Sequence, residues 1–290
     1  MLTRRLVLAS GVAAAFAPQA LAGERLRDHA AGIEAGLDGG RLGVAWLGPG
    51  GGTWTGHREN ERFLMCSTFK AFLVAAVFDR VQRNALRLEE MVTIAKEDLV
   101  AYAPVVEPKI ADGAISRLEL CRGAVSLSDN AAANLLLRDI GGPAELTRYM
   151  RRLGDGVTRM DRTEPTLNAH ETPEDVRDTS TPLAFVRSLR KVLFGKVLEP
   201  QYSELLLQWL RETGTGAARI RAGVPKTWDI GDKTGTSNDS IGATNDIAVF
   251  KVPGGRVQML SVFVDAPKLS GAEREAVIAQ VARNVVSALV

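Results

Sequence analysis

The sequence has little of the chemistry that metal sites and disulfide scaffolds require. Among its 290 residues are two cysteines, Cys66 and Cys121, and three histidines, His29, His57 and His170. Scattered in this way they do not form the paired spacing of a zinc site, so we expect no metal and no cofactor. The two cysteines fall on different predicted helices, and we therefore expect two buried, free thiols rather than a disulfide.

Excess charge, aromatic residues and long apolar runs are also scarce. The formal net charge is +2, from 36 basic and 34 acidic residues, and no basic stripe along the sequence suggests binding of nucleic acid. Aromatic residues make up 6%, so the core is expected to be mainly aliphatic. After residue 22 no segment reaches the ~18 unbroken apolar residues of a membrane-spanning helix. The remaining composition is that of a globular protein with one large domain or two closely joined lobes, expected to be a monomer.

Residues 1–22 have the pattern of an export signal. A charged start at Arg4-Arg5 precedes an apolar stretch over 6–16, and Ala20-Leu21-Ala22 resembles a cleavage site, with the cut before Gly23. The apolar stretch is too short to span a bilayer of ~30 Å. We therefore expect a secreted or periplasmic protein. The adjacent arginines leave both general secretion and twin-arginine export open.

The order of the predicted elements indicates an α+β protein. Strands are expected at 41–47, 52–57, 227–236, 246–251 and 257–264, and helices at 24–37, 68–81, over much of 118–210, and at 271–289. Both chain ends thus supply strands, and the middle is helical. We expect one catalytic domain over 23–290, with an α/β lobe from 23–61 and 212–290 and an all-α lobe from 62–211. The hairpin turn at 48–51 lacks the Gly-Lys-Ser/Thr ending of a phosphate loop.

The segment Ser67-Thr68-Phe69-Lys70 suggests nucleophilic catalysis. Residues three apart share one face of a helix, so Ser67 and Lys70 lie together. The helix is apolar on nearly all sides, and burial would lower the pKa of Lys70 and make it a plausible base toward Ser67. The backbone N–H groups at the helix start would favour a developing oxyanion.

The same spacing occurs a second time, at Ser188 and Lys191. Arg187 and Arg190 indicate a solvated surface at this second copy, so we place the nucleophile at Ser67.

Three further motifs follow the first in order along the chain: Ser128-Asp129-Asn130, Glu164-Pro165-Thr166-Leu167-Asn168 and Lys233-Thr234-Gly235-Thr236. They supply a second hydroxyl with an amide, a carboxylate that could activate water, and a cation with hydroxyls for an anionic group. The four motifs and their order resemble a class A β-lactamase over nearly all of residues 24–290. The resemblance implies a five-stranded antiparallel sheet flanked by helices, an all-α lobe, and a site between them.

The resemblance also implies roles for individual residues. Ser128 would pass a proton to the leaving nitrogen, Asn130 would bind the substrate amide, and Tyr102 would belong to the substrate-binding residues. Asp129 is expected to hold the local backbone instead of acting on the substrate.

A polar stretch over 162–178 resembles the Ω-loop of that family, whose ends an Arg–Asp pair ties together at Arg162 and Asp178. Glu164 would then activate the deacylating water, with Asn168 holding that water. The family has a cis peptide after this glutamate, and Pro165 makes a cis bond affordable.

The last motif is expected at a sheet edge that faces the substrate. Lys233 and Thr234 would bind the substrate carboxylate, and Gly235 would allow close approach to the backbone. The N–H of Thr236 would complete the oxyanion hole with that of Ser67. A second cation is usual in the family, and Arg219 fits it better than Arg221, although both remain open.

The resemblance implies hydrolysis of penicillins and cephalosporins through a serine acyl-enzyme. The alternatives are a penicillin-binding DD-peptidase, which lacks the Glu164 and Asn168 pair, and a β-lactam sensor domain, which would need a membrane anchor. An esterase with a Ser-His-Asp triad is excluded because no Gly-x-Ser-x-Gly motif is present. Carbapenems are less expected, because carbapenemases of the resembled family often bridge the cysteine before the nucleophile to one near this strand, and Ser237 offers no thiol that could bridge to Cys66.

Overall fold

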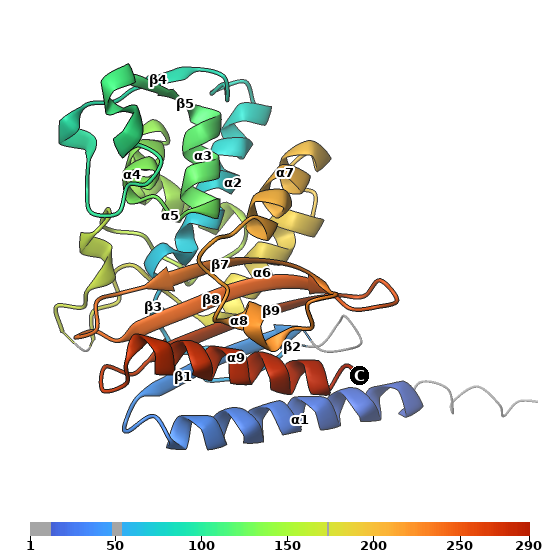
Figure 1. Ribbon diagram of the computed structural model, residues 1–290. Helices are drawn as coiled ribbons and strands as arrows, with labels where there is room; N and C mark the ends of the chain where they lie inside the picture. The colour runs from blue at the N-terminus through green and yellow to red at the C-terminus, as the bar shows by residue number, and fades with distance from the viewer. Residues whose placement is uncertain (1–12, 48–53, 173) are drawn as a thin grey trace, which may run out of the picture.

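The centre of the molecule is a five-stranded antiparallel sheet built from both ends of the chain. The computed structural model describes residues 13–47, 54–172 and 174–290. The strands are β1 (Arg41–Leu47), β2 (Trp54–His57), β7 (Asp229–Thr236), β8 (Ala243–Lys251) and β9 (Val257–Asp265), and their order across the sheet is β2-β1-β9-β8-β7. The predicted sheet and fold class are therefore confirmed (Figure 1).

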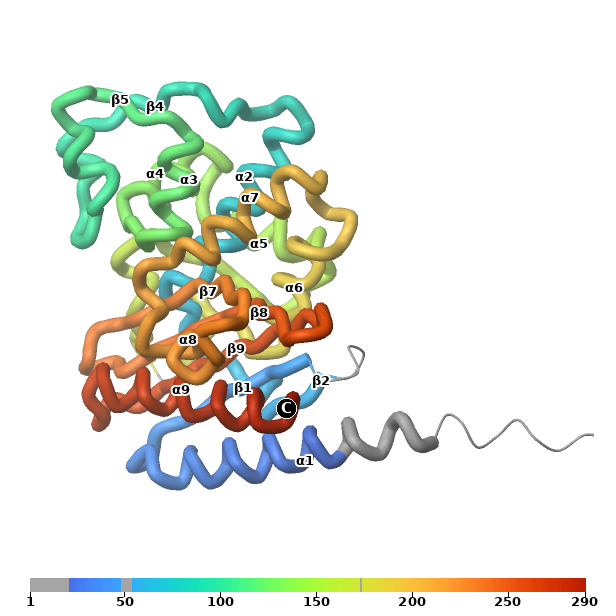
Figure 2. The backbone as a smooth tube through the Cα atoms, turned by 45° about the vertical axis from the view of Figure 1, so that its right-hand side comes forward, coloured from blue at the N-terminus to red at the C-terminus, as the bar shows by residue number. Residues whose placement is uncertain are grey.

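Three helices cover one face of this sheet. They are α1 (Ala13–Ala35), α8 (Ile220–Gly223) and α9 (Gly271–Ser287), and the first and last of them lie side by side in both views (Figures 1 and 2). On β1 the alternating residues Leu42, Val44 and Trp46 pack into this layer, whereas Ala45 faces the opposite side. Strands β1, β8 and β9 thus contribute to two apolar cores, one on each face of the sheet.

The second lobe is helical and lies against the other face. It contains α2 (Lys70–Gln82), α3 (Arg117–Ser126), α4 (Asn130–Asp139), α5 (Pro143–Arg152), α6 (Pro182–Phe194) and α7 (Pro200–Arg211). Two small ribbons join it, β3 (Phe63–Leu64) with β6 (Thr179–Ser180) and β4 (Met91–Thr93) with β5 (Ala114–Ser116). Short 3-10 turns complete the lobe at Cys66–Phe69, Lys96–Asp98, Glu107–Asp112 and Thr166–Asn168. Helix α2 runs through the middle of the lobe and is buried over its first ten residues, which explains why its sequence is apolar on all sides.

Some predicted boundaries differ from the structure. Strand β8 begins at Ala243, not at residue 246, because Thr244 and Asn245 are buried and bonded within the fold; the amide of Asn245 donates to the carbonyl of Leu64. Helix α1 begins at Ala13 and continues past the predicted cleavage point after Ala22. The predicted turn at 48–51 lies outside the described residues.

Both cysteines are buried and free, as the sequence predicted. Burial raises the pKa of each thiol far above its ordinary value, so both remain protonated. In the parts of the chain that the structure describes, no helix has the length and apolar character needed to cross a membrane.

Candidate active site

Ser67 lies in the single turn of 3-10 helix, Cys66–Phe69, that leads into α2. This turn packs closely against β7 at Gly235. A side chain there would bring its Cβ to 2.7 Å from the carbonyl oxygen of Met65 and 3.1 Å from the backbone nitrogen of Ser67. The sequence predicted a glycine that makes room for a ligand; in the structure Gly235 makes room for the backbone that carries Ser67.

Ser67, Lys70 and Glu164 meet at one carboxylate oxygen. The Ser67 hydroxyl donates to Glu164 Oε1 over 3.0 Å, and Lys70 Nζ lies 3.0 Å from the same atom. Lys70 and Glu164 have fully buried side chains. Burial lowers the pKa of Lys70, and the nearby Glu164 carboxylate opposes part of that shift. Because the serine hydroxyl is hydrogen-bonded to the carboxylate, Glu164 is placed to receive its proton directly, and Lys70 adjoins the same carboxylate oxygen.

Lys70 also connects this group to the second motif. Its ammonium donates to Asn130 Oδ1 over 2.5 Å and to the carbonyl of Ser128 over 2.8 Å. On the other side, the ammonium of Lys233 donates to the Ser128 hydroxyl over 2.9 Å. Burial lowers the pKa of Lys233 well below its usual range, and the positive charge of Lys70 lowers it further. Ser128 is therefore bound by two buried amines, by Lys233 at its hydroxyl and by Lys70 at its backbone carbonyl.

Asp129 is occupied with the backbone. Its carboxylate accepts from the N–H groups of Val105 and Val106 and from that of Ala132, which caps α4. These bonds hold the 102–106 segment beside the site and fix Ser128 in a left-handed conformation, with φ 59°. Tyr102 and Cys66 are also left-handed, at φ 65° and 45°. Such conformations cost about 1–3 kcal/mol each and persist where surrounding bonds over-determine the backbone.

The loop that carries Glu164 is tied at both ends. Arg162 Nε donates to Asp178 Oδ2 over 2.6 Å, and the backbone N–H groups of residues 161 and 162 donate to the other oxygen of Asp178. The Glu164–Pro165 peptide is cis. Asn168 Nδ2 donates to Glu164 Oε2 over 2.6 Å. Asn168 Oδ1 is buried and has no hydrogen-bond partner within the described chain.

The opposite wall is formed by β7 and by the segment before α8. Thr234 shares a hydrogen bond of 2.6 Å with Thr215, and Arg219 donates to the Thr236 hydroxyl over 2.7 Å. The guanidinium of Arg219 also bonds the carbonyls of Gly235 and Asn245, and its Nε contacts Glu275. A positive charge thus lies beside Thr236 at this wall.

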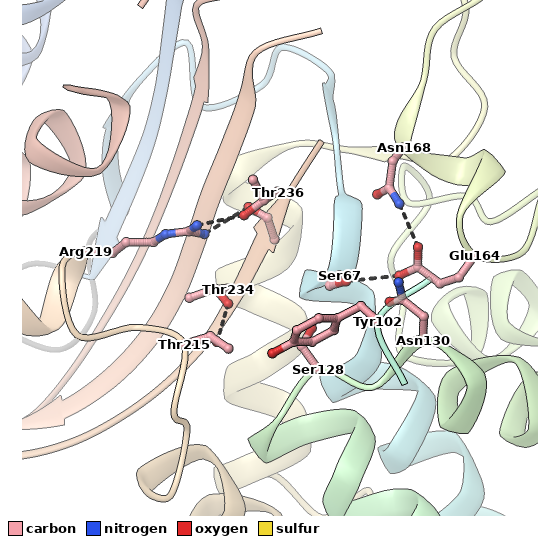
Figure 3. Close-up of a pocket in the computed structure, with 11 residues that line it drawn as sticks. Ser67, Tyr102, Ser128, Asn130, Glu164, Asn168, Thr215, Arg219, Thr234 and Thr236 are labelled. Carbon is pink, nitrogen blue, oxygen red and sulfur yellow. Dashed lines mark hydrogen bonds between the residues drawn. The ribbon is translucent and has the colours of Figure 1, made fainter. Parts of the chain in front are cut away.

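These walls enclose an open cavity of about 300 Å³ (Figure 3). Glu164 and Asn168 lie on one side of Ser67, and Arg219 with the threonines of β7 lies on the other. The cavity is lined by Ser67, Tyr102, Ser128, Asn130, Glu164, Asn168, Thr215, Arg219, Thr234, Gly235 and Thr236. Of the residues predicted from sequence, Lys70 and Lys233 lie immediately behind this lining and act on it through hydrogen bonds.

Two site residues were not predicted. Asn134 clamps the backbone of Glu164, accepting from its N–H and donating to its carbonyl, each over 2.9 Å. Its spacing of four from Asn130 on α4 places both on one helix face, and this was the available signal. Thr215 has no comparable signal, because the loop that presents it has no motif.

The second Ser-x-x-Lys copy lies apart from the cavity, but the reason given for rejecting it was wrong. Ser188 is buried, not on a solvated surface, and its hydroxyl donates to Asp155. Arg221, the alternative second cation, points into the fold and donates to the buried Asp232 over 2.8 Å.

Comparisons with known proteins agree with this geometry. The family model described as "Beta-lactamase enzyme family" matches residues 25–289. Beta-lactamase L2 of Stenotrophomonas maltophilia is 40% identical over 279 residues, which cover 96% of this chain and 90% of that protein. The carbapenem-hydrolyzing beta-lactamase KPC of Klebsiella oxytoca is 43% identical over 251 residues, covering 87% and 85%.

A solved structure has the same fold. It is that of the class A β-lactamase reconstructed for the last common ancestor of Gram-negative bacteria, which matches with a TM-score of 0.87 and 48% identity, covering 91% of this chain and 99% of that one. Taken with the family match over residues 25–289, these similarities establish that the chain belongs to the β-lactamase enzyme family, as a member of class A.

Proposed function

We propose that this protein hydrolyses the cyclic amide of penicillins and cephalosporins through an acyl-enzyme on Ser67. The observation that carries the proposal is the position of Glu164. One of its carboxylate oxygens accepts from the Ser67 hydroxyl and the other accepts from Asn168. A carboxylate that is hydrogen-bonded both to the nucleophile and to the Asn168 amide can act as the base when the acyl-serine forms. The same carboxylate can act again as the base when water hydrolyses the acyl-serine.

In the first half of the proposed reaction, Ser67 Oγ forms a bond to the lactam carbonyl carbon and the ring C–N bond breaks. The serine proton passes to Glu164 or to Lys70, which share a contact of 3.0 Å. The Ser128 hydroxyl gives a proton to the ring nitrogen. It regains a proton from Lys233 or Lys70. The backbone N–H groups of Ser67 and Thr236 stabilise the oxyanion. Tyr102 and Asn130 bind the rest of the substrate.

In the second half, a water adds to the acyl carbon, gives a proton to Glu164, and the serine ester bond breaks. The proton returns to Ser67, so that the product is the ring-opened acid. Support for the water position comes from Asn168, whose buried Oδ1 has no partner among the described residues while its Nδ2 fixes the carboxylate. Lys233, Thr234, Thr236 and Arg219 bind the substrate carboxylate, with Gly235 permitting their approach to Ser67.

A steady-state assay tests the proposed activity against its alternatives. We expect rapid hydrolysis of a penicillin and a cephalosporin, slow hydrolysis of a carbapenem, and no cleavage of a D-alanyl-D-alanine peptide. A DD-peptidase would cleave the peptide and stay acylated by the penicillin. A β-lactam sensor would turn over neither. Persistent acylation of the unaltered enzyme by every β-lactam would therefore contradict the proposal.

We expect Arg219→Ala to weaken binding of the substrate carboxylate. The variant loses a charge-assisted donor beside Thr236, which should cost about 1.5–3 kcal/mol of transition-state stabilisation. The value of kcat/KM should therefore fall roughly 10- to 150-fold, mainly through a higher KM. Hydrolysis rates at several substrate concentrations give both constants. Arg211→Ala is the matched control, because this exposed arginine pairs with Asp229 outside the cavity. An unchanged value for Arg219→Ala, together with a loss for Arg221→Ala, would transfer the role to Arg221.

The proposed location follows from the sequence. We take residues 1–22 as an export signal cut near Ala22-Gly23 and residues 23–290 as a monomeric catalytic domain that acts outside the cytoplasm. Either general secretion or twin-arginine export would deliver it.

A further inference from the structure

Two buried aspartates lie under the substrate-facing edge of the sheet and have no role in the reaction described above. Asp232 is on β7 and Asp246 on β8, and both are completely buried. Asp246 lies directly across from Thr234, and Asp232 across from Ala248. Opposed residues share a face, so the two aspartates are diagonal neighbours on one buried face of the sheet, with their Cα atoms about 7–8 Å apart.

Each aspartate uses one oxygen and leaves the other without a partner. Asp232 Oδ1 accepts from Arg221, and Asp246 Oδ2 accepts from the backbone N–H of Ile220 over 3.0 Å. Asp232 Oδ2 and Asp246 Oδ1 are buried and have no hydrogen-bond partner in the described chain. Gly216 lies over the first of these atoms so closely that a Cβ would approach it to 1.8 Å. Protein packing thus closes this side of the Asp232 carboxyl.

The surrounding charges do not balance two carboxylates. Arg221 pairs with Asp232, whereas no ion-pair partner within 4.0 Å is found for Asp246 among the described residues. Arg219 is bonded elsewhere and paired with Glu275 of α9. Lys233 projects from the other face of β7, toward Ser128, and Arg274 of α9 is bonded to Thr244 and Asp239. An unpaired buried carboxylate is costly, so a proton is the expected compensation. In agreement, burial raises the pKa of both aspartates, and Asp232 raises that of Asp246 further.

The aspartates flank the arginine that faces the substrate. Asp246 holds the N–H of residue 220, and Asp232 holds the side chain of residue 221. Arg219 immediately precedes both and is the N-cap residue of α8. We propose that Asp232 and Asp246 share one proton between their unpartnered oxygens and act as a positioning pair that fixes Arg219 beside the substrate pocket. The effect on substrate binding rests on the proposed function; the shared proton does not.

Carbon-13 NMR of the full-length protein with aspartate labelled at the carboxyl carbon tests the shared proton without any substrate. The two signals are assigned by their loss in D232N and D246N. We expect them to shift together, with one proton held well above the usual pH range of aspartate. In D246N the new amide donates to Asp232, so the remaining signal should stay ionised throughout. Two carboxyl signals that are both ionised over the whole pH range of the folded protein would overturn the proposal.

Kinetics test the positioning role. D246N keeps an acceptor for Ile220 and a donor for Asp232, so KM for a penicillin should stay within about twofold, whereas D246A should raise KM about tenfold with little change in kcat. In an Arg219→Ala background D246A should add no further rise. An equal rise in that background would refute positioning through Arg219. If D246A does not fold, an increase of KM in D246N to the Arg219→Ala level refutes it instead. If the unaltered protein hydrolyses no β-lactam, the proposed function is wrong. The NMR titration alone then decides whether Asp232 and Asp246 share a proton.

Discussion

Glu164→Gln should stop the enzyme at the acyl-serine. Glutamine keeps the size and polarity of the side chain but cannot take a proton from the deacylating water, so deacylation should slow by at least about 10²–10⁴-fold. Acylation should survive better. The Glu164 carboxylate raises the pKa of Lys70 through its charge and hydrogen bond, and its loss favours the neutral amine that can accept the Ser67 proton. Intact-protein mass spectrometry within seconds of adding a penicillin should show the stable adduct.

The matched control for this variant is Glu171→Gln. Glu171 lies in the same loop, but its side chain is largely exposed and pairs with Arg177. This change should leave turnover intact and show little adduct. If Glu164→Gln turned over penicillin at the rate of the unaltered enzyme, the water would be activated by another group and the proposed hydrolysis step would be wrong.

Ser67→Ala should abolish covalent chemistry. Without the hydroxyl no acyl-enzyme forms, and kcat/KM should fall by about 10⁴–10⁶-fold, leaving only what binding and the oxyanion hole contribute. Peptide mapping of the unaltered enzyme, quenched with a slowly hydrolysed β-lactam, should place the adduct on Ser67. An adduct on Ser128 or Ser188 in place of Ser67 would overturn the assignment.

The chain supplies its own control in the second Ser-x-x-Lys copy. Ser188→Ala removes a buried hydroxyl that bonds Asp155, so it should lower the free energy of unfolding by about 1 kcal/mol. Catalytic constants should be unchanged, because Asp155 retains bonds from Val157 and Thr158 and lies outside the cavity. The pair of variants separates a motif that performs chemistry from one that only matches its spacing.

Sequence reasoning identified the site residues whose type is demanded by chemistry. A serine one turn before a lysine in an apolar helix, and a glutamate in a polar loop, each carry a signal that survives without the structure. Thr215 and the Asp232–Asp246 pair do not, because their significance depends on which segments face them. Asp246 was even taken as the start of a strand, since the polar residues before it read as a loop.

The same limit explains the misjudged Ser188. An exposed arginine shows only that its own face of a helix is solvated. The residue next to it can lie on a buried face, as Ser188 does beside exposed Arg187 and Arg190. Gly235 was correctly singled out, but the atoms it avoids belong to the turn at Ser67, which lies 168 positions earlier in the sequence. Contacts of that kind are set by the fold and carry no local sequence signal.

The strand order has a consequence for how the protein is made. Strand β9, in the middle of the sheet, is synthesised last among the strands, and it pairs with β1, where Arg41 and Asp265 are separated by 224 positions. Contacts this distant slow folding, because a long loop must close before they form. Until β9 emerges, β1 and β8 each present an open edge that could pair with another chain. The turn at Ser67 rests on β7 of the same sheet, so the nucleophile should reach its final geometry only after β9 has been synthesised.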